Sequence, residues 1–542
     1  MMLMVSVGAL ADNERPNGAP ATGKSITLTN PSAGHTYELY QIFTGTFANI
    51  DGDDTLGNVA YGNGITLTDG KYDGKTAAEL AATITQSEAG ARAFANTVDS
   101  ALQNGDSKTA ASGSPASLVW SGLSEGYYII KDVTTAANMP EGHTADLVVV
   151  QVLDNVTIAA KSGTVIFDKK VKDHNNSTQA PTVYDEWGKV SDYDLNDDVP
   201  YQVTITLPAN FSSYETYSMT VKDVMDPGLS FNNDVAVYVG SSETALSATG
   251  TETVDVEGTP TEQGVTYYEV KTTGIGSGET FNIVFPNVKK IAGAGDNVTF
   301  TITYSAKLTG SDVKYGKPGN ENEAWLTYSN NPTTGAEGGT TPHKTTLTFV
   351  YKFEVDKVDP DGKALDGATF ELYKYEKTAA DAGDWQSKTL VEAASGSEFT
   401  IDGLDAGWYK LVETASPAGY NKIDPIFFVI EHTYNAEGTD ITALTATKTD
   451  ENGTKKTGTD AALSANLVHV ATVADDPETT DVDESTAEVA AGLVSTDVVN
   501  EQGVELPSTG GIGTTIFYVA GSILVLAAAI LLITKRRMGA QD

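Results

Sequence analysis

The strongest constraint on the fold is an alternation of apolar and polar residues that recurs along the chain. It is clearest in four short segments, Ser25–Thr29, Tyr201–Leu207, Val298–Tyr304 and Thr346–Val350. Because successive side chains of a β-strand point to opposite faces, each segment would bury one face and expose the other. Clusters of Gly, Asp, Asn and Pro lie between such segments, as turns do in antiparallel β-sandwiches. The sequence therefore predicts a mainly β fold built from tandem Ig-like β-sandwich domains.

One region has a different period. Between about residues 76 and 102, apolar side chains recur at the spacing of one helix face, at Leu80, Ile84, Phe94, Val98 and Leu102. We expect a helical insertion here that packs on the sheet of the first domain.

At 542 residues the chain is too long for one ordinary hydrophobic core. Strand-rich blocks and turn-rich breaks predict an N-terminal domain at 24–162, a middle domain at 163–345 and a third domain at 346–500. Residues 501–542 form a separate C-terminal region.

The composition excludes several classes of function. Asp and Glu number 73 against 34 Lys and Arg, a formal charge of −39, so no basic surface is available to neutralise the phosphates of a nucleic acid. Cysteine is absent, which rules out disulfides and thiol chemistry. The six histidines lack the spacing of a zinc site, and the acidic runs Asp51–Asp54 and Asp194–Asp198 lack that of a calcium loop. We therefore expect no cofactor, no metal ion and no enzymatic turnover.

Both ends carry targeting features. Residues 1–11 are apolar and end in Ala9–Ala11, which is typical of the second half of a secretory signal peptide cleaved before Asp12; a buried N-terminal strand is the alternative. Near the other end, Ile516–Thr534 is an apolar run of about 19 residues, enough for a transmembrane helix. The basic residues that follow would remain cytoplasmic, which places the rest of the chain outside the cell; they are Lys535, Arg536 and Arg537.

Shortly before the apolar run lies the pentapeptide LPSTG, made of Leu506, Pro507, Ser508, Thr509 and Gly510. The order of pentapeptide, apolar helix and basic tail resembles the cell-wall sorting signal of Gram-positive surface proteins. The resemblance implies that a sortase cuts between Thr509 and Gly510. Its cysteine would form a thioester with Thr509, which an amine then releases.

Segments throughout the body carry a second resemblance: Gly34–Phe43 and Gly122–Ile130 in the first domain, Asp168–Asp173, Asp192–Tyr201 and Asn322–Pro332 in the middle domain, and Phe353–Tyr373 and Gly407–Tyr420 in the third. They resemble the sortase-assembled backbone pilins with intramolecular isopeptide bonds. The third domain is similar to the collagen-adhesin B-type, or CNA-type, domain. The resemblance covers nearly the whole mature chain.

This resemblance implies a secreted structural subunit of a covalently polymerised pilus that is anchored to the Gram-positive cell wall and supports adhesion. Its partners would be pilin-class and housekeeping sortases, identical pilin subunits and peptidoglycan, with minor pilins and host surface ligands as further candidates. A monomeric wall-anchored adhesin that binds host matrix or glycan is the alternative function.

An isopeptide bond joins a neutral lysine amine to an asparagine carboxamide beside an acid, so it requires polar side chains on the apolar face of a strand. In the third domain, Lys357 shares a face with Phe353 and Val355. Glu413 shares the inward face of its segment with Tyr409 and Leu411, and Asn500 precedes the sorting signal. The resemblance makes Glu413 the catalytic acid of a Lys357–Asn500 bond.

In the middle domain, Lys169 shares a face with apolar residues of its segment, which directs Lys169 inward and Lys170 outward. On the closing segment, Asn322 shares a face with Ala324 and Leu326, and we take Asn322 rather than Asn320; the resemblance places the acid at Asp223. We predict a Lys169–Asn322 bond catalysed by Asp223. The adjacent pair Lys169–Lys170 and the Asn-rich loop allow a slip of register, which would select a neighbouring residue instead.

The first domain carries an acid, Asp132, on a segment that resembles the acid-bearing strand. We find no lysine on a suitable apolar face there, so we predict no isopeptide bond in that domain. Backbone pilins also present an exposed lysine, usually in a Tyr-Pro-Lys-Asn motif, that attacks the thioester of a neighbouring subunit. That motif is absent, and Lys161 is the nearest equivalent by position; an ordinary linker lysine is the alternative.

Overall fold

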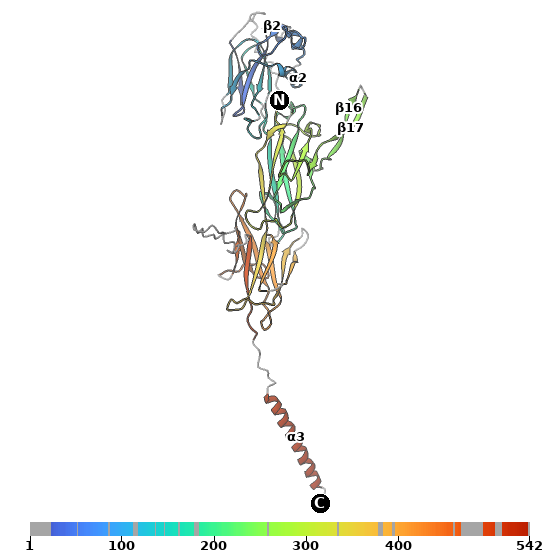
Figure 1. The fold of residues 1–542 in the computed structure, drawn as a ribbon, viewed down its shortest axis with the longest axis vertical. Coiled ribbons are helices and arrows are strands. Elements are labelled where there is room, and N and C mark those ends of the chain that lie inside the picture. The colour runs from blue at the N-terminus through green and yellow to red at the C-terminus, as the bar shows by residue number, and fades with distance from the viewer. Residues whose placement is uncertain are drawn as a thin grey trace, which may run out of the picture.

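The computed structural model describes residues 23–50, 53–84, 87–111, 117–135, 137–145, 147–160, 163–177, 184–256, 259–332, 335, 337–377, 383–392, 396–458, 461–467, 492–503 and 512–539. Strands make up 51% and helices 11% of the structure, which confirms the predicted mainly β fold. The sheets form three units in a row, and a long helix continues beyond the last of them (Figure 1). The predicted signal peptide, residues 1–11, lies outside the described residues.

The strands of the N-terminal unit are β1 (Lys24–Thr29), β2 (Thr36–Ile50), β3 (Asp53–Tyr61), β4 (Asp106–Thr109), β5 (Leu118–Leu123), β6 (Gly126–Asp132), β7 (Leu147–Val152) and β8 (Val156–Ala159). They form two sheets, of order β5-β1-β8 and β3-β2-β6-β7, with β4 paired to β2. The larger sheet buries both faces, because Ile129 and Val149 belong to one core while Ile130 and Val148 belong to another.

The predicted helical insertion is present as two helices, α1 (Ala77–Ala81) and α2 (Glu88–Val98). Ser87 begins the second helix, because its side chain accepts a backbone hydrogen bond at 3.0 Å and caps the helix. Phe94 of α2 packs on Phe43 of β2, with ring centroids 5.8 Å apart. The apolar helix face therefore covers the sheet, as the sequence predicts.

The strands of the middle unit are β9 (Ile166–Asn175), β10 (Tyr184–Gly188), β11 (Val190–Asp192), β12 (Asp198–Thr206), β13 (Met219–Met225), β14 (Leu229–Phe231), β15 (Ala236–Val239), β16 (Thr249–Val256), β17 (Thr259–Thr266), β18 (Glu269–Lys271), β19 (Phe281–Phe285), β20 (Thr299–Leu308), β21 (Asn320–Ser329), β22 (Glu337–Thr340) and β23 (Lys344–Phe349). One sheet has the order β10-β9-β12-β20-β14, with β15 on β20. The other has the order β11-β23-β21-β13-β19-β18, with β22 on β21. The hairpin β16–β17 is a separate sheet that projects sideways from the unit (Figure 1).

The strands of the third unit are β24 (Tyr351–Val358), β25 (Thr369–Glu376), β26 (Asp384–Glu392), β27 (Glu398–Leu404), β28 (Gly407–Ala415), β29 (Ile426–Tyr434), β30 (Ile441–Thr449), β31 (Ala462–Asn466) and β32 (Leu493–Val499). They form one sheet of order β26-β25-β28-β29-β30-β31-β32-β24-β27. Its core includes Phe353, Phe370, Leu411 and Phe428, all fully buried. The first strand, β24, runs parallel to the last, β32.

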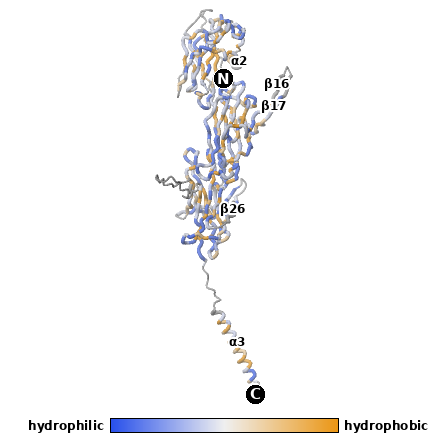
Figure 2. The backbone as a smooth tube through the Cα atoms, in the orientation of Figure 1, coloured by the Kyte–Doolittle hydropathy of each residue, from blue (hydrophilic) through white to orange (hydrophobic). Residues whose placement is uncertain are grey.

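The C-terminal helix is α3 (Ile512–Met538). Within its segment Thr515–Met538, an 18-residue window has a mean hydropathy of 2.7, and the apolar side chains are exposed, so the helix is long and apolar enough to cross a membrane. Figure 2 shows the apolar stretch ending in a hydrophilic tip, where the basic residues lie.

The middle and third units are joined without a linker. β23 runs into β24 with Val350 between them, and Val190 of β11 packs into the core of the third unit. The amide of Leu195 donates to the carbonyl of Gly403 at 3.0 Å, which ties a middle-unit turn to the third unit. The boundary predicted between residues 345 and 346 lies within β23, and the domain limits stay predictions.

Buried charge strengthens this joint. Lys374 of β25 forms ion pairs with Asp194 of the middle unit, at 3.0 Å, and with Asp405 of the third, and all three residues are buried. Burial alone would lower the pKa of Lys374, but the charges of Asp405 and Asp194 outweigh it and raise that pKa. The lysine therefore stays charged and bridges the two units.

We expect Lys374→Ala to destabilise the chain strongly, by about 3–5 kcal/mol, because it leaves two buried carboxylates without a cation. The control Lys455→Ala removes an exposed ion pair with Glu431 and should have an effect of about 1 kcal/mol or less. Chemical denaturation of the purified chain, followed by tryptophan fluorescence, measures both. Equal effects of the two substitutions would contradict the role of Lys374 at the joint.

Candidate cross-linking sites

Lys169 lies on the inward face of β9 and is fully buried in the middle unit. Its Nζ atom donates hydrogen bonds to Asn322 Oδ1 at 2.6 Å, to Asp223 Oδ2 at 2.6 Å and to the Tyr304 hydroxyl at 2.8 Å. Asp223 on β13 and Asn322 on β21 come from paired strands of the opposite sheet. The structure thus brings the predicted lysine, asparagine and acid into contact across the sandwich.

Burial dominates the electrostatics of this group. It lowers the pKa of Lys169 and raises that of Asp223, while the attraction between the two charges opposes both shifts. The neutral pair of amine and carboxylic acid and the charged pair of ammonium and carboxylate carry the same total number of protons. They differ only in which of the two groups holds one of them. The proton can therefore pass from Lys169 to Asp223 without exchange with solvent. Tyr304 orients the acid, because its hydroxyl donates to Asp223 Oδ2 at 2.6 Å.

The neighbouring residues differ from these in their surroundings. Lys170 is only partly buried, on the other face of β9. Asn320 is buried, but both ends of its side-chain amide are already hydrogen-bonded. Its Oδ1 accepts from the Lys314 amide, and its Nδ2 donates to the carbonyls of Lys314 and Thr348. Asn322 Nδ2, in contrast, makes no hydrogen bond among the described residues. That nitrogen is the atom that leaves as ammonia when a lysine attacks the carboxamide.

A second group surrounds Lys357 of β24, which is also fully buried. Lys357 lies opposite Val498 on the parallel strand β32, and Asn500 follows that strand directly. Lys357 Nζ donates to the main-chain carbonyls of Val498 at 2.8 Å and Val358 at 3.2 Å. Burial lowers the pKa of Lys357, and the negative charge of Glu413 opposes that shift.

Glu413 contacts the asparagine rather than the lysine in this unit. Asn500 Nδ2 donates to Glu413 Oε1 at 2.8 Å, and the amide of Ile423 donates to Glu413 Oε2 at 2.9 Å. Both Glu413 and Asn500 are fully buried. Glu413 is therefore placed to protonate the nitrogen that leaves. Attack on Asn500 would require Lys357 to turn away from the carbonyls that it now contacts.

The acid of the N-terminal unit has a histidine partner that sequence reasoning missed. His35 Nδ1 lies 2.6 Å from Asp132 Oδ2, and both side chains are buried. The other oxygen of Asp132 accepts a hydrogen bond from the Thr134 amide at 3.0 Å. His143 Nδ1 lies 3.0 Å from His35 Nε2 and extends the network. In the sequence, His35 directly precedes the aromatic segment that forms β2, and this position could have indicated that its side chain lies near the core.

Two further predicted features lie outside the described residues. They are the LPSTG pentapeptide, Leu506–Gly510, and the linkage candidate Lys161. Both assignments stay predictions.

Comparison with known proteins bears on the anchor and on the third unit. The LPXTG cell wall anchor motif matches residues 498–538, and the SpaA family, a prealbumin-like fold domain, matches residues 351–448. The first range contains Asn500 and the pentapeptide, and the second contains Lys357 and Glu413.

Two relatives match over most of the chain. The trypsin-resistant surface T6 protein of Streptococcus pyogenes serotype M6 is 24% identical, over 94% of this chain and 94% of its own length. The solved T6 backbone pilin of serotype M6 Streptococcus pyogenes, a modular three-domain structure, superposes with a TM-score of 0.50 at 20% identity. That superposition covers 89% of this chain and 99% of the other. Together these findings support a Gram-positive, sortase-assembled backbone pilin.

The chain is a surface protein anchored to the cell wall of Gram-positive bacteria. The comparisons confirm the resemblance predicted from the sequence and the LPXTG class of its C-terminal signal. They point to a structural rather than a catalytic protein.

The middle group generates a test by mass. We expect the wild-type chain to be lighter than its sequence by two ammonia molecules, one for each predicted bond. Lys169→Met should recover one ammonia, because it removes the nucleophile and keeps the buried volume. The control Lys170→Met alters the outward neighbour and should leave the mass deficit at two. Intact-mass spectrometry decides, and an unchanged deficit in Lys169→Met would show that another lysine is linked.

The third-unit group generates a test of stability. Glu413→Gln keeps the shape of the side chain but cannot shuttle a proton, so the Lys357–Asn500 bond should not form. Loss of that cross-link should lower the free energy of unfolding of the third unit by an amount on the order of 4 kcal/mol, by the loop-closure argument used for disulfides. The control Glu431→Gln lies on the surface of β29 and should keep both the bond and the stability. Retention of the bond in Glu413→Gln would exclude Glu413 as the catalyst.

Proposed function

We propose that the chain is the repeating subunit of a covalent pilus, cross-linked internally by two isopeptide bonds and joined to its neighbours by sortase. The observation that carries the internal bonds is the buried contact of Lys169 with Asn322 and Asp223, both at 2.6 Å. The match of the LPXTG anchor motif to residues 498–538 supports the external linkage.

Each internal bond forms when the lysine replaces the side-chain nitrogen of the asparagine. The lysine Nζ attacks the carboxamide carbon of the asparagine, and a new amide C–N bond replaces the old one. The amide nitrogen takes up the proton lost by the lysine, through Asp223 or Glu413, and leaves as ammonia. No oxidant or cofactor enters this step. A buried acid serves as general acid and base because its neutral form is favoured away from water.

The bond between subunits is proposed to form by a second, enzyme-dependent route. A pilin-class sortase would cleave after Thr509 and hold that residue as a thioester on its cysteine, releasing the segment that begins with Gly510. The amine of Lys161 on the next subunit would attack the thioester carbonyl and free the sortase thiol. A housekeeping sortase would pass the last subunit to an amine of peptidoglycan. Because head-to-tail linkage does not close on itself, it extends into a fibre.

The internal bonds suit a subunit that carries load along a fibre. Lys169 lies on the first strand of the middle unit, and Asn322 lies on a strand near the C-terminal end of that unit. Lys357 belongs to the first strand of the third unit, and Asn500 directly follows its last strand. A covalent bond between the two ends of a unit lets tension pass across it without unfolding the strands between. Such a fibre would hold adhesive partners away from the cell wall.

Lys161→Ala tests the linkage between subunits in cells that produce the pilus. The substitution should abolish the high-mass ladder on a blot of cell-wall extract, while the monomer remains anchored through Thr509. The control Lys71→Ala removes an exposed lysine of the same unit and should leave the ladder intact. A ladder that persists in Lys161→Ala, or mass spectra that join Thr509 to another lysine, would refute Lys161. A single band in the wild type would favour the monomeric adhesin instead.

A further inference from the structure

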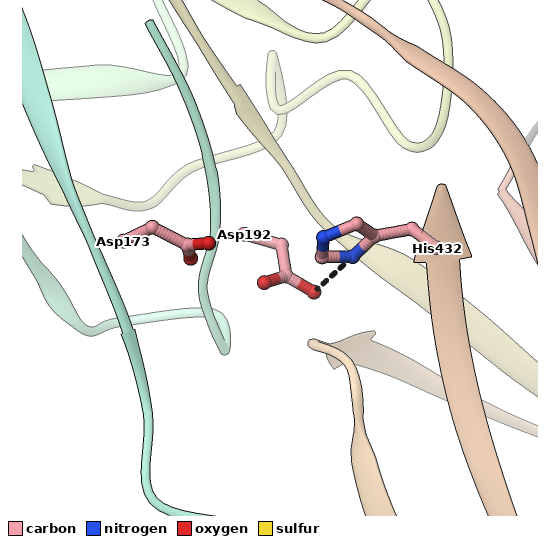
Figure 3. Close-up of side chains that lie close together, drawn as sticks. All are labelled: Asp173, Asp192 and His432. Atoms are coloured by element: carbon pink, nitrogen blue, oxygen red, sulfur yellow. Dashed lines mark ion pairs between the residues drawn. The ribbon is translucent and has the colours of Figure 1, made fainter. Parts of the chain in front are cut away.

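Three side chains with metal-binding groups meet where the middle and third units join. Asp173 lies on β9, Asp192 on β11 and His432 on β29, so two units contribute. One ligand atom from each residue lies within 4.8 Å of the other two. Figure 3 shows the three side chains next to one another on separate strands. We call these three residues the joint cluster.

The two aspartates of the joint cluster are buried, His432 is partly buried, and the hydrogen bonding of the cluster is incomplete. Asp173 is 4% exposed and Asp192 is 1% exposed. Among the described residues, Asp173 Oδ1 makes no hydrogen bond, whereas His432 Nδ1 pairs with Asp192 Oδ2 at 3.4 Å. A buried carboxylate oxygen without a donor is unfavourable in a folded protein. An unpartnered buried oxygen on a residue of such a cluster points to a bound ligand.

Other contacts hold the donor atoms in position. The hydroxyl of Tyr434 donates to Asp173 Oδ2 at 2.5 Å, and the amide of Ala406 donates to Asp192 Oδ2 at 2.5 Å. These bonds fix both carboxylates and leave Asp173 Oδ1 available. Outer hydrogen bonds of this kind orient the ligands of known metal sites.

The donor set selects the kind of ion. One imidazole nitrogen with two carboxylates suits Zn²⁺ and similar transition metals, whereas Ca²⁺ and Mg²⁺ prefer oxygen ligands alone. A cavity of about 590 Å³ adjoins the cluster and is lined by all three of its residues, together with Ser177, Trp408 and Tyr434. The cavity leaves room for water molecules to complete the coordination shell.

We propose that Asp173, Asp192 and His432 bind a divalent transition-metal ion, with Zn²⁺ the best match, at the joint between the middle and third units. The ion would neutralise two carboxylates that are buried beside each other. Because its ligands come from both units, it would also hold β9 and β11 of the middle unit to β29 of the third. This site is separate from the lysine groups and does not depend on their cross-links.

Titration of the full-length chain in detergent tests the proposal. After chelation and transfer to metal-free buffer, isothermal titration with ZnCl₂ should show one saturable site. MnCl₂ should bind the same site more weakly, and CaCl₂ should not displace zinc. Zinc should also raise the melting temperature of the wild-type chain. The absence of stoichiometric zinc binding, or of any thermal shift, would overturn the site and leave only the ion pair between His432 and Asp192.

Variants separate the joint cluster from the surface. His432→Ala and Asp173→Ala should each weaken zinc binding at least tenfold, and Tyr434→Phe should weaken it by roughly tenfold through loss of an orienting bond. The control His174→Ala removes an exposed histidine that lies 3.3 Å from Asp185, and it should bind zinc as the wild type does. Zinc binding that is lost in His174→Ala and kept in His432→Ala would show an adventitious surface site only. Tyr434→Phe keeps all three ligands, so its weaker binding is informative even where an alanine variant does not fold.

Discussion

Lysine amines buried in β-sandwich cores set the conditions under which this chain folds. An ammonium group taken out of water is strongly unfavourable unless opposite charge or hydrogen bonds compensate. Lys374 has two buried carboxylates beside it, whose charges outweigh the effect of burial and raise its pKa. Lys169 has one carboxylate and one carboxamide, and burial lowers its pKa. The number of acids around a buried lysine thus distinguishes a permanent ion pair from an amine that is able to attack a neighbour.

The period of a strand is enough to find polar residues that point into a core. Lys169 shares a face with Phe167, and the structure buries both. The same rule identifies Lys374, which shares a face with Phe370 and Leu372. Fold class and the candidate lysines follow from this rule because alternation is a local property of the backbone.

Local alternation cannot show which inward residues meet. Asp192 and His432 approach each other because a strand of the middle unit lies against the third unit, and nothing in their separation along the chain indicates this. His35 and Asp132 are brought together by the pairing of β2 with β6, which is likewise a tertiary event. The break between α1 and α2 is different in kind, because the cap at Ser87 is readable from the sequence once the second helix is known to begin there. The contacts between residues of the middle and third units therefore cannot be predicted from the sequence and become visible only in the folded structure.

The passage from β23 to β24 through Val350 has a mechanical consequence. A connection of this kind holds no spare length, so the two units cannot move apart by straightening a linker. A pull along the long axis in Figure 1 would be carried by strand hydrogen bonds and buried ion pairs from the outset. In a fibre of such subunits, each rigid segment would be longer than one sandwich domain. The fibre would therefore bend mainly at the contacts between consecutive chains.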